Sequence, residues 1–444
     1  MILPAKSPMR AKRHLPSWAL TLLIALAFYV IVFFAERIGW LNPYWYQIIQ
    51  LAGIMAISAL GLNLIYGFNG QFSLGHIGFY AIGAYGSALI TKDLAVNWSG
   101  TRIGALSWMI AGQVGILVVL FAARLLRLGP IRKRLAAGLA GYLKPYESGL
   151  IVLLVTLVLS AVAIAVGVLA TWGLHTVLAA VFKLILSLPQ GVARGVVFLI
   201  ALLTGGTMAA LVAYLVGLPL LRLSSDYFGI ATLGFSVMIY TGLQNSDQVI
   251  ATMKGARGMV GIPTWTTWTW VFWALLVIVL IMRHLVHSSY GRAIISIRED
   301  EIAAKTMGID AAQSKATAFA VGGFFAGVAG GLYAHLFGFL HPSTFNFIKG
   351  FDPLIIIVFG GLGSMTGTVL ASVLFALLIE GLRVLLPQGF EDWRFVIYPI
   401  ILLLIMLLRP QGLLGTTEWG WLRAPLPPER DIPVPDRTTQ EQEA

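Results

Sequence analysis

Cysteine is absent from the 444 residues, which excludes disulfides, thiolate metal ligands and cysteine nucleophiles. Charge is also scarce. Charged residues make up 11% of the chain and hydrophobic residues 58%, and the mean hydropathy is +0.85, whereas soluble domains typically carry about 25% charged residues. The chain is therefore predicted to be an all-α polytopic membrane protein with about 10–12 transmembrane or broken helices.

Motifs for nucleotide and metal sites are missing as well. The chain has no G-x-x-x-x-G-K-[ST] loop, and its glycine-rich stretches at 67–75 and 360–367 lack the lysine that a nucleoside triphosphate site requires. It has no helical His-Glu zinc motif and no recognisable catalytic serine or aspartate setting. We predict no catalytic, cofactor or metal site in this chain, so any energy source must lie in a partner.

Basic residues lie mainly in short loops beside apolar spans. A net charge of +11 would suggest nucleic-acid binding in a soluble protein, but such clusters in a membrane protein mark cytoplasmic loops. Arg10, Lys12 and Arg13 therefore place the N-terminus in the cytoplasm, ahead of a first helix that lacks a convincing cleavage site and is predicted to be retained. The cluster at 124–134 predicts another cytoplasmic loop, and no nucleic-acid partner is expected.

Apolar windows long enough to cross a bilayer recur along the chain. We predict helical spans near 17–35, 46–66, 105–122, 149–170, 195–216, 228–243, 267–285, 316–336, 366–385 and 395–408. The stretches 71–90 and 353–363 are interrupted by glycine, as are discontinuous helices that line transport paths. The stretch 172–188 could cross, re-enter or lie in the interface. Counting it as not crossing puts the N-terminus, 124–134 and 290–313 on one side.

The segment 290–313 concentrates charge in a chain that otherwise avoids it. Its apolar residues recur at helical spacing up to Gly308, which tolerates positive φ. Asp310 followed by Gln313 resembles a capping box that opens a second helix. A helix, a glycine turn and another helix at the membrane surface predict a docking element for a partner.

Docking needs an apolar face that a partner can bury and charged edges that fix its register. Ile294, Ile297, Ile302 and Ala303 are predicted to supply the apolar face. The alternative is an ordinary solvated loop, which a charged run alone would favour. The residues assigned to the coupling loop are Arg298, Glu299, Asp300, Glu301, Ala303, Ala304, Gly308 and Asp310.

A glycine-rich block from Asn63 to His76 is the candidate translocation path. Polar side chains at membrane depth need a partner or water, and the glycines allow the backbone to break. Packing of helices through small residues is an equally weighted alternative. The path residues assigned are Asn63, Gly67, Asn69, Gly70, Gln71, Ser73, Gly75 and His76, with Gly360, Gly361 and Gly363 from the second broken stretch.

Five blocks in order carry a family resemblance: GLNLIYGFNGQFSLGHIGFYAIGAYGSAL from 61, LPLLRLSSDYFGIATLGF from 218, GRAIISIREDEIAAKTMGID from 291, VFGGLGSMTGTVLAS from 358 and LRPQGLLG from 408. The chain resembles the M-type permease subunits of bacterial branched-chain amino-acid ABC importers over roughly 46–415. The blocks are specific together, although any one glycine-rich block would be weak evidence.

The resemblance implies an ABC importer permease fold in the bacterial inner membrane. It implies that the chain pairs with a second, homologous permease, two cytoplasmic ATPase subunits that use ATP, and a periplasmic substrate-binding protein that delivers an amino acid. The loop 290–313 would be the EAA-type coupling motif and would insert its first helix into the ATPase. Related permeases carry polar amino acids, amides or urea, so the aliphatic substrate is an expectation.

The resemblance also divides the chain. It implies a permease domain at 17–415 with a family-atypical helical insertion at 94–197, while charge and composition add a basic cytoplasmic segment at 1–16 and a polar, proline-rich tail at 416–444. The alternative of an ATP-independent secondary transporter or channel predicts acids within the spans, of which there are few, such as Glu380 near a helix end. An intramembrane enzyme is a weaker alternative.

Overall fold

In a computed structural model, the described part of the protein is predominantly helical. The structure describes residues 17–96, 103–128, 148–221, 223 and 225–385, and beyond them 393, 396–397, 400, 403–404, 407–415 and 418–419. The predicted segment 1–16, the loop centre at 129–147, most of the predicted span 395–408 and most of the tail 416–444 lie outside the described residues.

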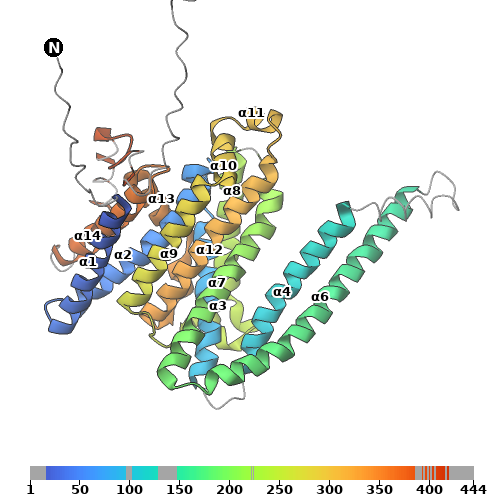
Figure 1. Cartoon of the computed structure of the whole chain (residues 1–444), viewed down its shortest axis with the longest axis horizontal. Helices are drawn as coiled ribbons and strands as arrows, with labels where there is room; N and C mark the ends of the chain where they lie inside the picture. The colour runs from blue at the N-terminus through green and yellow to red at the C-terminus, as the bar shows by residue number, and fades with distance from the viewer. Residues whose placement is uncertain are drawn as a thin grey trace, which may run out of the picture.

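Long helices cross the molecule in alternating directions (Figure 1). Six of the described helices contain stretches long and apolar enough to cross a membrane, which fits a multi-pass α-helical membrane protein. The helices are α1 (Ser17–Ile38), α2 (Pro43–Leu62), α3 (His76–Val96), α4 (Ile103–Leu128), α6 (Ser148–Leu186), α7 (Gln190–Leu220), α8 (Ser225–Gln244), α9 (Trp268–His287), α10 (Ser289–Glu299), α11 (Glu301–Thr306), α12 (Ala311–Phe337), α13 (Phe351–Gly360) and α14 (Met365–Leu385).

Two of the helical regions are broken, as the glycines predict. The chain leaves α2 through a π-helix, η1 (Asn63–Phe68), and then runs without helix to the start of α3. Helix α13 is only 10 residues long and stops at a turn before α14. Both breaks therefore lie where the sequence predicts discontinuous helices.

Helices α3, α7 and α12 pack closely at the centre of the bundle. Small residues make this possible, because a Cβ at Gly83 of α3 would overlap the backbone of Gly327 in α12, and a Cβ at Gly205 of α7 would lie 2.7 Å from the carbonyl oxygen of Gly83. Such close backbone approach through small residues is the usual way to join helices in a membrane. Aromatic side chains, including Phe79 and Phe319, fill the space around this contact.

Helices α4 and α6 form an antiparallel arm that projects from the bundle (Figure 1). The 39 residues of α6 form one continuous helix, so the predicted spans 149–170 and 172–188 are a single element. Phe182 packs the base of the arm against the bundle. Gln113 joins it to α7, since its Nε2 donates to Thr204 O at 3.2 Å and its Oε1 accepts from Thr207 Oγ1 at 2.6 Å.

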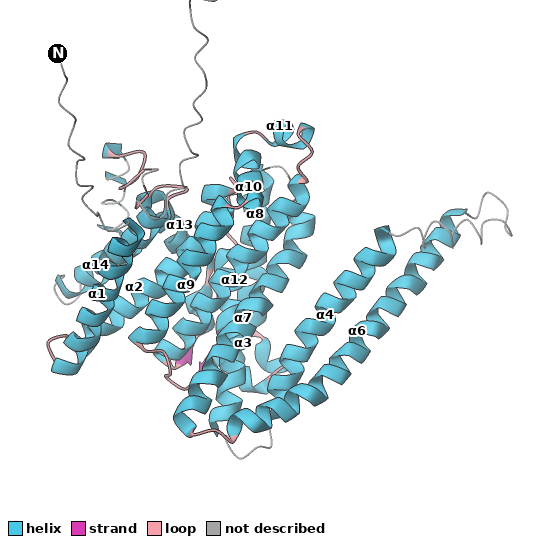
Figure 2. Ribbon diagram, in the orientation of Figure 1, coloured by secondary structure: helices cyan, strands magenta, loops and turns pink. Residues whose placement is uncertain are grey.

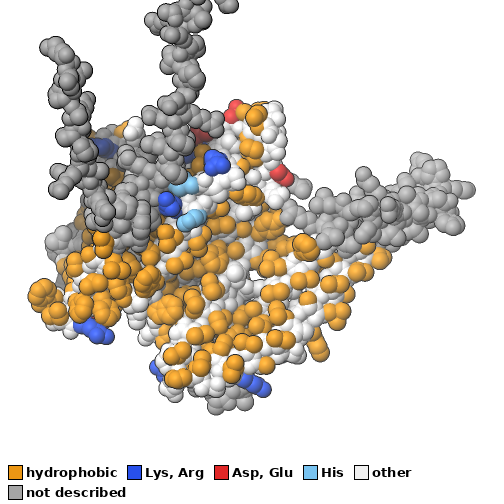
Figure 3. Space-filling model, in the orientation of Figure 1, with side chains coloured by type: hydrophobic (Ala, Val, Ile, Leu, Met, Phe, Trp, Pro, Cys, Tyr) orange, Lys and Arg blue, Asp and Glu red, His pale blue; other side chains and the backbone are white. Residues whose placement is uncertain are grey.

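The two ends of the bundle differ. Helices α10 and α11 lie at the same end as the start of α1 and the free ends of the arm (Figure 1), which is the arrangement that the count of crossings requires. The short strands β1 (Met259–Val260) and β2 (Phe339–Leu340) pair antiparallel at the other end (Figure 2). Hydrophobic side chains cover the face between the ends, and charged side chains gather near the ends (Figure 3).

Candidate coupling loop and broken helices

The charged segment forms two helices before its glycine turn, where the sequence predicts one. Ser288 Oγ accepts a hydrogen bond from Gly291 N and opens α10, which ends at Glu299. Asp300 Oδ1 then accepts from Ile302 N at 2.8 Å and from Ala303 N at 3.0 Å. Because Asp300 caps the N-terminus of α11, the helix before it must end there. The prediction of one helix up to Gly308 is therefore wrong, since the structure has two helices that meet at Asp300.

The end of the loop follows the prediction. Gly308 has φ +85°, a left-handed conformation that favours glycine, and no atom lies within 4 Å of where its Cβ would be. Asp310 Oδ1 accepts from Gln313 N at 3.0 Å and starts α12. The turn at Gly308 and the cap at Asp310 together join α11 to α12 and fix the angle between these two helices.

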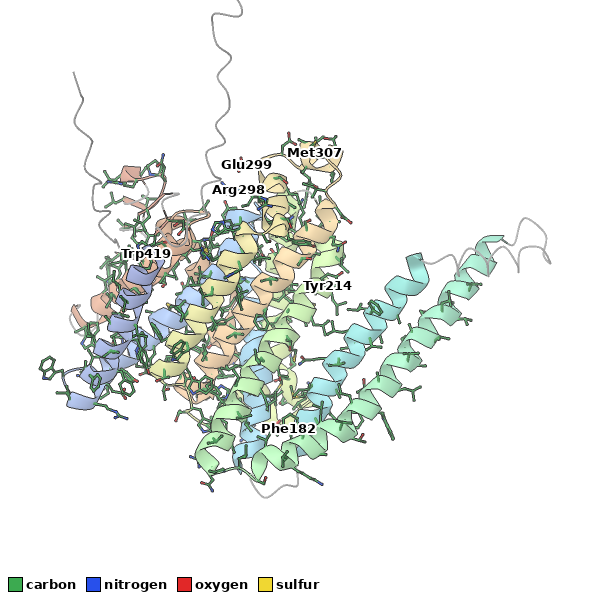
Figure 4. All side chains as sticks on the ribbon, viewed as in Figure 1. Phe182, Tyr214, Arg298, Glu299, Met307 and Trp419 are labelled. Atoms are coloured by element: carbon green, nitrogen blue, oxygen red, sulfur yellow. The ribbon has the colours of Figure 1, made fainter. Side chains whose placement is uncertain are left out.

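The two helices turn their apolar residues in opposite directions. Ile294 and Ile297 of α10 are buried inside the chain, so the prediction that they form the partner-facing surface is wrong. Ile302 and Met307 are 76% and 83% exposed. Ala303 is exposed and Ala304 is buried. The apolar surface available to a partner is therefore on and just after α11, and Met307 lies at the outer tip of the molecule (Figure 4).

Glu301 holds the loop together through two lysines. Its Oε1 lies 2.8 Å from Lys305 Nζ, and its Oε2 lies 2.6 Å from Lys315 Nζ in α12. These hydrogen bonds, first that of Lys305 and then that of Lys315, lower the pKa of the Glu301 carboxyl below its ordinary value. Glu299 is exposed beside Arg298, whose Nε lies 3.8 Å from its Oε1.

Arg298 points back toward the bundle. Its Nη1 donates to the carbonyl oxygen of Gly67 in η1 at 2.6 Å. Figure 4 shows Arg298 nearer the bundle than Met307. The candidate coupling segment and the candidate path are therefore in direct contact through two residues 231 positions apart in sequence.

Asn63, the first predicted path residue, is fully buried and fully bonded. Its Nδ2 donates to Ser364 O and to Thr368 Oγ1, both at 2.9 Å, and its Oδ1 accepts from Gly363 N at 2.9 Å. A Cβ at Gly67 would overlap Asn63 Oδ1. Both residues join η1 to the turn after α13, so this part of the block is packed against that turn.

The beginning of α3 is also packed. His76 is buried, and its Nε2 lies 2.8 Å from Ser58 O of α2. Ser73 is buried, and its Oγ accepts from Gly75 N at 3.4 Å. A Cβ at Gly75 would lie 2.7 Å from the carbonyl oxygen of Thr232 in α8. These residues bring α2, α3 and α8 together.

Besides His76, whose Nδ1 has no hydrogen-bond partner among the described residues, two predicted path residues keep unpaired polar atoms. Asn69 is only 2% exposed, yet neither its Nδ2 nor its Oδ1 has a hydrogen-bond partner among the described residues, and the same holds for Gln71 Oε1. Gly70 between them is exposed, with φ +73°. Buried amides without partners are costly, so these two are the members of the block best suited to meet water or a polar ligand.

The second predicted set lies at the break between α13 and α14. Gly361 and Gly363 have φ +112° and +83°, and a Cβ at Gly360 would strike the backbone of Gly367. Leu413 N donates to Phe359 O at 2.8 Å and caps the end of α13. These three glycines therefore shape a tight turn beside Asn63.

Glu418 completes this turn and was missed by the sequence reasoning. Its carboxylate accepts hydrogen bonds from Met365 N and Thr366 N, at the first turn of α14, and from Thr366 Oγ1. A carboxylate at a helix N-terminus is favourable. Its position just beyond the last matched block, in a segment predicted to be tail, gave no local signal for this contact.

Comparisons with known proteins agree with the resemblance. Residues 44–143 and 149–407 match the family described as branched-chain amino acid transport system / permease component, and the match runs through α4 and α6. The high-affinity branched-chain amino acid transport system permease protein LivM of Escherichia coli K12 is 31% identical over 255 residues, 50% of this chain and 59% of that protein. LivM of Salmonella typhimurium LT2 is 31% identical over 258 residues, with the same coverage.

A probable branched-chain amino acid transport permease protein LivM of Methanocaldococcus jannaschii is 27% identical over 237 residues, 47% of this chain and 66% of that protein. The alignments thus span about three-fifths of each bacterial relative. No solved structure gives a significant match. Because the family match covers most of the chain, including both broken helices and the candidate coupling segment, this protein belongs to the branched-chain amino acid transport system permease family.

Proposed function

We propose that this chain is a permease subunit of an ATP-binding-cassette importer for branched-chain or related amino acids in the bacterial inner membrane. The observation that carries the proposal is the exposed pair of Ile302 on α11 and Met307 just after it, which project from a loop that also contacts η1 through Arg298. This geometry suits a surface that docks a moving partner and connects it to the broken helices. ATP would be hydrolysed by two ATPase subunits at this end, which would be cytoplasmic together with the N-terminus.

A second, homologous permease fits beside α8. Leu74 N donates to Thr232 Oγ1 at 3.1 Å, so one face of α8 packs on the glycine-rich block. The opposite face exposes apolar side chains, among them Ile230 and Met238. A second permease on that face would complete a path next to Asn69 and Gln71.

The opposite end of the bundle suits the substrate-binding protein. Lys254 and Arg257 are exposed there, next to exposed Val249 and Val260. Exposed cations beside apolar side chains match a partner with an acidic rim. The names of the relatives favour a branched-chain amino acid as the cargo, and binding-protein ligand screening would separate it from polar amino acids, amides and urea.

The test is the recovery of ATPase subunits with tagged chain from native membranes in mild detergent. The double variant Ile302→Glu/Met307→Glu is expected to lower this recovery by about tenfold or more, because charge in an apolar interface is costly. Val249→Glu, a matched change of an exposed apolar residue at the other end, is expected to leave it unchanged. Equal recovery from all three chains, or amino-acid transport by the chain alone without ATP, would overturn the proposal.

A further inference from the structure

The end of α10 is pressed against the π-helix. Arg298 Nη1 donates to Gly67 O at 2.6 Å. A Cβ at Gly70 would lie 3.1 Å from Arg298 Cγ and 3.4 Å from its Cα, and a Cβ at Gly363 would lie 3.3 Å from its Nη1. Glycines on both sides therefore let one side chain lie between η1 and the turn that follows α13.

Gly67 O is a suitable acceptor because it belongs to the last turn of a helix, where carbonyl groups lack regular partners. Asn69 N and Gly70 N donate to Tyr66 O, and Gln71 N donates to Ile65 O. None of these three amides donates to Gly67 O, and Arg298 Nη1 does. A guanidinium at a helix C-terminus is also favoured by the helix dipole.

The contact reaches both broken helices. Asn63, four residues before Gly67, bonds Gly363 N and Ser364 O in the turn between α13 and α14. Ile295 of α10 packs against the buried cluster that contains Leu64 and Phe68 of η1. A displacement of α10 would thus act on η1 and on that turn together.

We propose that Arg298 is a positioning residue that holds α10 to η1 throughout the transport cycle, so that movement of α11 displaces both broken helices as one unit. The inference rests on the proposed function, since it assumes that a partner moves α11. It assigns Arg298 an inward task, distinct from contact with that partner, and it requires that the contact never opens.

The first test replaces Arg298 with Gln in the full complex with its ATPase subunits and binding protein. Arg298→Gln is expected to retain the ATPase subunits and ATP hydrolysis, while amino acid transported per ATP falls by about tenfold or more, a typical size for coupling between sites. The control is Arg292→Gln on the same helix, because Arg292 Nη1 donates to His287 O at the end of α9 and not to η1. It is expected to leave the ratio unchanged.

The second test replaces the contact with a covalent bond. In this cysteine-free chain, Gly70→Cys with Arg298→Cys should form a disulfide, because the Cβ position at 70 lies 3.4 Å from Arg298 Cβ and disulfides join Cβ atoms about 3.5–4.5 Å apart. The reduced variant is expected to be uncoupled. Oxidation is expected to restore transport per ATP, whereas oxidation that blocks transport would show that the contact must open and would overturn the inference.

The outcomes separate the inference from the proposed function. If the unmodified chain retains no ATPase subunits, the proposed function fails. If it retains them and Arg298→Gln matches Arg292→Gln, or if Arg298→Gln alone loses the ATPase subunits, only the inference is overturned. Should Arg298→Gln not accumulate in membranes, Arg298→Lys decides, because it keeps the charge without the forked donor. An intermediate ratio supports the inference, and an unchanged ratio overturns it.

Discussion

Replacement of Asn63 by alanine tests whether this side chain joins the two broken helices. Asn63 is fully buried, and its Oδ1 is the acceptor for Gly363 N. Ser364 O and Thr368 Oγ1 still bond each other without it, at 2.7 Å, so one backbone N–H is left unpaired. That loss costs about 1–3 kcal/mol, and the cavity adds roughly 1 kcal/mol. We expect Asn63→Ala to lower the free energy of unfolding by about 2–4 kcal/mol.

The assay is reversible unfolding by SDS in mixed micelles, followed by the intrinsic fluorescence of the 13 tryptophans. The control is Asn245→Ala, because Asn245 lies just after α8, is exposed, and its side chain bonds only the carbonyl of Thr241 at the end of that helix among the contacts described. Exposed substitutions of this kind usually change stability by about 0.5 kcal/mol or less.

Equal stabilities of the two alanine variants would refute the reasoning. They would show that Gly363 N finds water or another acceptor, and that Asn63 is available to the path instead. The same variants would then separate packing from path lining, since loss of transport without loss of stability would assign Asn63 to the path.

Three further predictions concern glycine and charge. Gly308→Ala is expected to cost about 1–2 kcal/mol through its positive φ, seen as faster hydrogen exchange in α11. Gly83→Ala is expected to destabilise the bundle by about 1–3 kcal/mol or more, whereas Gly112→Ala, with open space at its Cβ, is expected to stabilise α4 slightly; thermal unfolding compares the two. Glu301 has a lowered pKa, so its stabilising effect is present above its ordinary value of 4.5 and is lost as the pH falls below it. The difference in unfolding temperature between Glu301→Gln and the unmodified chain should shrink over that range.

Local patterns predicted the elements that depend on nearby residues. Apolar windows located the long helices, Gly308 and Asp310 located the turn and the cap before α12, and the glycines at 360–363 located the break after α13. Each of these features is set by a few consecutive residues. The ambiguous stretch 172–188 needed the structure, which joins it to the preceding span in one helix, and so did the division of the segment 290–307 at Asp300.

Features set by distant contacts could not be predicted. Asn63 at the start of a π-helix has no local signature, and its role depends on Gly363 and Ser364, about 300 residues away. The same is true of Glu418 at the N-terminus of α14. Helical spacing showed that Ile294 and Ile297 share a face, but it could not tell whether this chain or a partner covers that face.

The charged residues of the candidate coupling loop mostly make contacts within the chain itself. Asp300 and Asp310 cap helices, Glu301 bonds two lysines, and Arg298 bonds η1. Because these charged side chains hold the loop in one conformation, the exposed apolar side chains Ile302 and Met307 point in a fixed direction. Docking at α11 should therefore depend weakly on salt and strongly on apolar area. A partner whose binding to this chain is abolished by moderate salt would indicate that it docks on a different surface.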